Sequence, residues 1–207
     1  SRDLKATLPA AILSTTTFYR VLFESSRHAY RLSSCVVSLY GCLEFLPAAD
    51  SSLTLFDIDS CTKQIIRQKL DIAAGKVSDE QVVVDLTEEN VFPDGMILTP
   101  DRKSLIVALY DPGDPAFGSA RQYRVSDGQL EAVWQCPGSP RVTCPQLVEY
   151  DGKVKLLLTT AVEHMLADQK ARHPNAGCLF LGDTEFTSIG DQPIFPLSRA
   201  DVESPTR

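Results

Sequence analysis

The sequence predicts an all-β protein made of repeated four-stranded antiparallel units, the architecture of a β-propeller. Three observations lead to this prediction. Hairpin-forming segments recur about 50 residues apart, a period typical of a propeller blade. The second strand of each hairpin is almost wholly apolar, as a strand covered on both faces should be. The strands that follow alternate polar and apolar residues, which is typical of half-exposed outer strands.

The three hairpins carry the repeat most clearly, because each has two strands joined by a short polar turn. They are expected at residues 43–47 with 53–59, 96–100 with 105–109, and 146–150 with 154–160. Outer strands are expected at residues 64–70, 81–86, 121–125, 130–134 and 177–181, and strands of an earlier blade at 18–22 and 29–32. The polar stretch 163–172 allows one short turn of helix within a loop.

The repeat predicts an incomplete propeller of about three to three and a half blades over residues 18–197. Residues 1–17 are expected to form an N-terminal extension and residues 198–207 a C-terminal tail. A β-sandwich without closure is the alternative, although sandwiches rarely repeat so regularly. So few blades do not close a ring, so we expect a fragment or one half of a larger assembly. Its open sheet edges would favour self-association.

Composition excludes several classes of function. The 207 residues carry a net charge of −7 with acidic and basic residues well mixed, so no basic patch predicts nucleic-acid binding. No apolar run is long enough to cross a bilayer, which predicts no membrane partner. The six cysteines include no CxxC pair, a pattern that favours reduced thiols in a cytoplasmic protein over a disulfide framework or a zinc site.

Asp94 is the main candidate for chemistry. In a propeller the innermost strand of each blade lines the central channel, and the residues just before that strand reach the channel mouth. Asp94 lies there, between Pro93 and Gly95. The alternative interpretation is an ordinary Asp-Gly turn at a loop tip. Thr143 has the matching position in the next unit, where it either lines the pocket or caps the strand.

Glu163 and His164 are further candidates for substrate contact. They follow the second strand of the third hairpin, in the loop that leaves the channel end of that unit. A solvated loop is the alternative reading of this pair.

Several motifs in order resemble the SMP-30/gluconolactonase/LRE family. They are Phe92–Met96, Lys103–Ala108, Arg141–Cys144, Leu158–Ala161 and Asn175–Phe180. The resemblance implies a six-bladed propeller that hydrolyses sugar lactones with a divalent cation, Ca²⁺, Zn²⁺, Mg²⁺ or Mn²⁺, at the channel mouth. The implied protein ligands are a Glu from the first blade, an Asn from the third, and the Asp of the Pro-Asp-Gly motif.

Of these implied ligands only the last maps cleanly, onto Asp94. The family's Asn falls within residues 40–43, which contain no Asn, and Glu24 and Glu44 are poor substitutes for the Glu. The resemblance therefore predicts that Asp94 binds the cation and positions or deprotonates the attacking water. A non-catalytic or truncated propeller that serves in binding or calcium handling is the competing hypothesis.

Overall fold

The computed structural model describes residues 43–47, 52–71 and 73–190, together with the backbone of three short strands nearer the N-terminus. The described elements are almost all strands. They are β1 (Lys5–Ala6), β2 (Phe23–Ser25), β3 (His28–Ala29), β4 (Leu43–Pro47), β5 (Leu53–Asp59), β6 (Gln64–Asp71), β7 (Lys76–Asp85), β8 (Phe92–Leu98), β9 (Ser104–Tyr110), β10 (Phe117–Arg124), β11 (Leu130–Pro137), β12 (Val142–Tyr150), β13 (Lys153–Thr160), α1 (Ala167–Arg172) and β14 (Phe180–Asp183).

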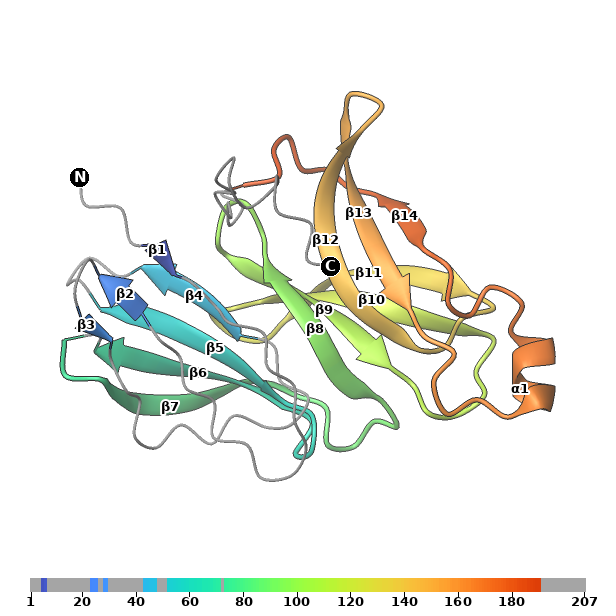
Figure 1. Cartoon of the computed structure of the whole chain (residues 1–207), viewed down its shortest axis with the longest axis horizontal. Coiled ribbons are helices and arrows are strands. Elements are labelled where there is room, and N and C mark those ends of the chain that lie inside the picture. Colours follow the sequence, from blue (N-terminus) through green and yellow to red (C-terminus); the bar gives the residue numbers. More distant parts are fainter. Residues whose placement is uncertain are drawn as a thin grey trace, which may run out of the picture.

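These strands form separate antiparallel sheets in which sequence neighbours are also spatial neighbours. The sheets are β1-β2-β3, β4-β5-β6-β7, β8-β9-β10-β11 and β12-β13-β14. Figure 1 shows the last three fanned side by side, with β8 between β4 and β12. The chain is thus an incomplete β-propeller, and the predicted fold class is confirmed.

The middle strand β9 explains how the blades hold together. Its side chains alternate between two core clusters, because successive residues of a strand face opposite sides of the sheet. Leu105, Val107 and Leu109 pack toward the β4–β7 blade. Ile106 and Ala108 pack toward the β12–β14 blade. The nearly continuous apolar run in the sequence therefore reflects burial on both faces, as predicted.

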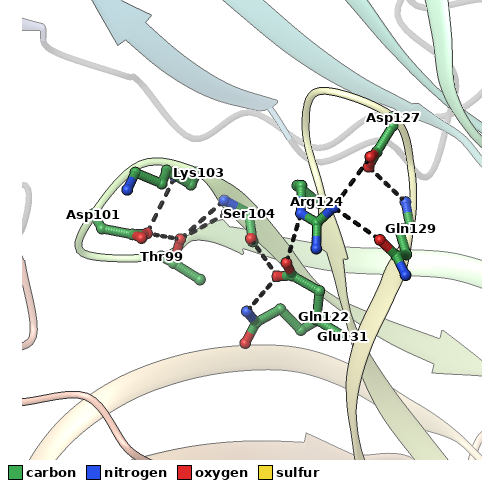
Figure 2. A network of polar contacts seen from close by, with 9 residues as sticks. All are labelled: Thr99, Asp101, Lys103, Ser104, Gln122, Arg124, Asp127, Gln129 and Glu131. Carbon is green, nitrogen blue, oxygen red and sulfur yellow. Dashed lines mark hydrogen bonds and ion pairs between the residues drawn. The ribbon is translucent and has the colours of Figure 1, made fainter.

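A polar network fixes the turns at the end of the middle blade that lies away from Asp94 (Figure 2). Thr99 Oγ1 donates to Asp101 Oδ1 over 2.7 Å, and the buried Ser104 donates from Oγ to Glu131 Oε2 over 2.6 Å. Arg124 Nε donates to the other oxygen of Glu131 over 2.8 Å. The β8–β9 turn is thereby tied to β10 and β11, which keeps the blade's strand register fixed.

Some predicted boundaries differ from the observed ones. The prediction for the inner strand began at residue 96, whereas β8 starts at Phe92, so Asp94 lies within the strand. The last outer strand is β14, slightly later than the predicted 177–181, and α1 falls within the predicted 163–172. The predicted strand at 18–22, residues 40–42 and both predicted chain-end segments lie largely or wholly outside the described residues.

Within the part of the chain that the structure describes, no helix is long and apolar enough to cross a membrane. Self-association through open sheet edges is untested by the fold and stays a prediction.

Candidate functional site

A β-bulge places each of the two inner-strand candidates. Pro93 pairs with Leu109 and Met96 with Val107, so two residues of β8, Asp94 and Gly95, stand opposite one residue of β9. Such a bulge turns side chains away from the regular alternation of the strand, and bulges are common next to active sites. The sequence signal for this feature was the Pro-Asp-Gly tripeptide itself, because proline and glycine within a strand often mark a bulge.

The neighbouring inner strand carries a bulge at the matching place. Val142 pairs with Thr160 and Cys144 with Thr159, which leaves Thr143 as the extra residue. The hydroxyls of Thr143 and Thr159 lie 2.7 Å apart in a hydrogen bond. This contact ties β12 to β13 at the bulge, and the role of Thr143 in lining a pocket stays a prediction.

The two bulges lie against one another at Gly95. A Cβ atom added there would lie 2.6 Å from Thr143 O and 2.9 Å from Cys144 Cα. No side chain fits that space, so glycine is what allows β8 and β12 to approach so closely. Asp94 and Thr143, singled out separately from the sequence, are therefore brought to the same place.

Asp94 lies in an environment that disfavours its charge. It is half-buried, and burial, aided by the negative charge of Glu163, raises its pKa from 3.8 to about 6. Both effects oppose ionisation, since low polarity and a nearby like charge each destabilise a carboxylate. Two predicted site residues on different blades, Asp94 and Glu163, are thus within electrostatic reach of one another.

Glu44 on β4 is a second carboxyl group whose pKa is raised by burial, although its sequence position suggested a poor metal ligand. Burial raises its pKa from 4.5 to about 7, opposed by a hydrogen bond from the Phe45 backbone. Burial first, then the charges of Asp94 and Glu44, raise the pKa of the Cys144 thiol. Cys144 therefore lies within the electrostatic field of both carboxylates, Asp94 on the adjacent inner strand β8 and Glu44 on β4 beyond it. The signal in the sequence was a charged residue inside an otherwise apolar inner strand.

Tyr110 and Arg141 contact each other within electrostatic reach of Asp94. The Arg141 guanidinium lies 5.4 Å from the centre of the Tyr110 ring, and the two residues also form an isolated β-bridge. Burial raises the pKa of Tyr110; Arg141 opposes this, and the charges of Glu163 and Asp94 add to it. Neither residue was singled out as a site residue from the sequence, although Arg141 was part of a recognised motif.

The backbone of Glu163 and His164 contacts both Tyr110 and Arg141. Tyr110 Oη donates to Glu163 O over 3.3 Å, and Arg141 Nη2 donates to His164 O over 3.4 Å. Both acidic and imidazole side chains point largely into solvent, with 67% of Glu163 and 79% of His164 exposed. Their backbones are held at the site while their side chains remain available to a ligand.

Asp114 anchors the far end of the loop that carries Glu163 and His164. Its carboxylate accepts hydrogen bonds from Arg172 Nε over 2.8 Å and pairs with the buried His173 Nε2 over 2.5 Å. The hydrogen bonds from His173 and Arg172 lower the pKa of Asp114. The loop between β13 and α1 is therefore fixed at both ends, at the site and beside the β9–β10 connection.

Whether these residues suit a metal ion can be judged from their donors. Asp94 and Glu44 supply hard carboxylate oxygens, the donors that Ca²⁺ and Mg²⁺ prefer, and burial raises the pKa of both groups. Within residues 43–47, 52–71 and 73–190, no three His, Cys, Asp or Glu side chains gather closely enough to hold an ion. The described donors fit a divalent cation in kind but do not complete its coordination.

The fold and the acidic inner-strand ends define a partial β-propeller with carboxylates directed to one end of its inner strands. The family model described as "SMP-30/Gluconolactonase/LRE-like region" matches residues 48–162, more than half of the chain. The chain belongs to this family, which confirms the resemblance seen in the sequence motifs.

Relatives and solved structures agree with that assignment. The chain is 30% identical over 142 residues to a Bacillus subtilis (strain 168) protein named "Putative sugar lactone lactonase YvrE", covering 68% of this chain and 44% of that protein. A 59-residue stretch is 41% identical to an uncharacterized protein of Sulfolobus acidocaldarius, covering 28% of this chain and 21% of that one. The chain thus spans less than half the length of these relatives.

Two crystal structures share the fold at low sequence identity. One is regucalcin from Agrobacterium tumefaciens strain C58, described as a calcium-binding protein, with a TM-score of 0.62, 22% identity, and coverage of 82% of this chain and 53% of that one. The other is a luciferin-regenerating enzyme, with a TM-score of 0.54, 14% identity, and coverage of 79% and 51%. At these identities the likeness concerns the fold, and it supports a blade arrangement common to longer propellers.

Proposed function

We propose that this chain supplies the Asp94 side of a divalent-metal-dependent hydrolase site for sugar lactones. The observation that carries the proposal is the pair of half-buried carboxylates, Asp94 and Glu44, at neighbouring inner strands, both with raised pKa values. Perturbed acids at the mouth of a fold's central channel are frequent in functional sites. The lactonase name of the Bacillus subtilis relative supports the choice of substrate class.

The chemistry proposed for these residues follows from their environment. A bound divalent cation would polarise the lactone carbonyl and stabilise the negative charge that develops on its oxygen. Asp94 and Glu44 would hold the ion through their carboxylate oxygens. Asp94 would also position the attacking water or accept its proton. Thr143, Glu163 and His164 would border the sugar.

The proposal is tested by measuring the hydrolysis of D-glucono-1,5-lactone. The readout is the rate of proton release in a weakly buffered solution, compared with the rate without protein. Mg²⁺, Ca²⁺, Mn²⁺ and Zn²⁺ are each supplied in turn after treatment with a chelator. We expect turnover with at least one ion and its loss in Asp94→Asn, whereas the control Asp127→Asn, an exposed acid at the opposite end of the blade, keeps it. Unchanged turnover in Asp94→Asn would show that Asp94 takes no part in the mechanism. Absence of turnover with every ion would refute the hydrolase function.

Calcium binding without catalysis is a second candidate function. It is favoured by the calcium-binding description of the Agrobacterium structure. Calorimetric titration together with the hydrolysis assay separates the two functions. A calcium-handling protein binds Ca²⁺ in an Asp94-dependent manner yet does not accelerate proton release from the lactone. A cytoplasmic location is proposed with either function, and the free thiols of all four described cysteines support it.

A further inference from the structure

Arg141 is the one feature of the site that lactone hydrolysis by the carboxylates leaves unexplained. It directly precedes β12, and only 3% of the residue is exposed. Its Nε and Nη1 atoms are buried and have no hydrogen-bond partner in the part of the chain that the structure describes. Its remaining nitrogen, Nη2, makes one long bond of 3.4 Å to His164 O.

A buried guanidinium in this state is costly. A buried cation loses its hydration, and apolar surroundings do not replace it. Burial is therefore compensated only by a paired anion or by a full set of hydrogen bonds. The Tyr110 ring at 5.4 Å offers a cation–π contact, which compensates only part of this cost. No described carboxylate forms an ion pair with Arg141, although Asp94 and Glu163 are close enough to influence the same tyrosine.

The unpaired Nε of Arg141 matches one class of ligand. Nε and Nη2 lie on the same edge of the guanidinium and form a planar fork that donates two parallel hydrogen bonds to a carboxylate, once Nη2 gives up its long bond to His164 O. We propose that Arg141, backed by Tyr110, is an anion-binding subsite for the carboxylate that forms when the lactone ring opens. This inference rests on the proposed function for the identity of the ligand, while the unpaired guanidinium itself does not depend on it.

The cover over Arg141 provides a route for the ligand. The Glu163–His164 segment lies over the guanidinium through two backbone contacts, each longer than 3.2 Å. His164 has a φ of 56°, a left-handed conformation that is unfavourable for a residue with a side chain. A carboxylate that displaces His164 O from Nη2 would exchange one long contact for short charge-assisted bonds, and would let this segment relax.

Binding of sodium D-gluconate to the whole chain tests the proposal in chelator-containing buffer, where no turnover is required. Gluconamide, which has the same hydroxyls without the charge, is the matched ligand control. We expect wild-type protein to bind gluconate at least about tenfold more tightly than gluconamide, since a charge-assisted pair contributes more than a neutral contact. Arg141→Gln removes this preference, and Arg141→Lys retains part of it. Arg124→Gln, which removes an exposed cation at the other end of the blade, leaves it unchanged.

Because Arg141 is buried, a second measurement guards against misfolded variants. In ¹⁵N-labelled wild-type protein, gluconate should shift one arginine Nε–H signal that gluconamide leaves in place, and Arg141→Lys, checked for native thermal unfolding, assigns that signal. Equal binding of the two ligands, or a gluconate preference that survives Arg141→Gln, overturns the inference even if lactone is hydrolysed. An Arg141-dependent preference in a chain that hydrolyses no lactone supports the anion subsite and removes only the hydrolase.

Discussion

Replacing Asp94 by Asn should make the protein more stable at neutral pH while removing its proposed activity. The folded state raises the pKa of this carboxyl from 3.8 to about 6, so the folded protein holds the proton more tightly than the unfolded chain does. The free energy of unfolding therefore falls as pH rises from about 3.8 to about 6, and the loss is complete above that range. Asparagine is neutral throughout and avoids this loss.

The size of the effect follows from the shift. A difference between 3.8 and about 6 corresponds to about 3 kcal/mol at about 1.4 kcal/mol for each pKa unit. Asp94 is only half-buried, and solvent screening reduces the expected gain to roughly 1–2 kcal/mol at pH 7.5. At pH 4 most of the carboxyl is protonated in the folded protein, so the variant and the wild-type protein should differ little.

Urea-induced unfolding at pH 7.5 and pH 4, in the presence of a chelator, measures this difference. Asp127→Asn is the control, because Asp127 is exposed and pairs with Arg124 on the surface, and its removal should change stability by less than about 1 kcal/mol at pH 7.5. Added Ca²⁺ or Mg²⁺ should stabilise the wild-type protein more than Asp94→Asn, since a ligand that binds only the folded state raises its stability. An Asp94→Asn variant that is less stable at pH 7.5, or equally stabilised at both pH values, would refute the reasoning.

Three further predictions concern the framework of the site. Gly95→Ala forces a Cβ to within 2.6 Å of Thr143 O, so we expect a loss of about 1–3 kcal/mol in urea unfolding together with loss of lactone turnover; native stability would contradict the close approach of β8 and β12. Ser104→Ala breaks the buried bond to Glu131 and should cost about 1–2 kcal/mol while leaving turnover per folded molecule intact. Leu156→Ala should cost about 2–5 kcal/mol because Leu156 is fully buried between blades; a thermal unfolding midpoint unchanged from wild type would place it outside the core.

The fold was largely predictable because each blade carries its own local pattern. The polar turn that joins 43–47 to 53–59 gave the hairpin β4–β5 with its observed bounds, and the turn that joins 146–150 to 154–160 gave β13 to within one residue. The inner strand β12 starts at Val142, four residues earlier than predicted. The start of β8 was missed because Pro93 and Gly95 read as a turn, whereas the close contact with β12 holds them in a bulged strand. Packing between blades overrode local propensity there.

The candidate site was less predictable, since it depends on which side chains meet across blades. Asp94 carried a motif, and the sequence alone pointed to it. Glu44 carried none, and Arg141 belonged to the Arg141–Cys144 motif without being singled out as a site residue. The interest of both comes from their burial, which appears only when the strands are assembled. A charged residue at the channel end of an inner strand was the available signal, at residue 44 within an apolar strand and at residue 141 directly before one.

The two charge anomalies of the site have a common origin in the blade arrangement. The inner strands β8 and β12 approach closely at Gly95, and this approach brings Asp94 into electrostatic reach of Cys144. Arg141, one residue before β12, is held back by Tyr110 and the Glu163–His164 backbone and forms no ion pair with Asp94. The Asp94 carboxyl and the Arg141 guanidinium are thus both partly or fully buried without pairing, which lowers the stability of the fold. In the proposed function the carboxylates bind a cation and the guanidinium binds an anion, which are the charges that a metal-assisted ring opening to a carboxylate brings together.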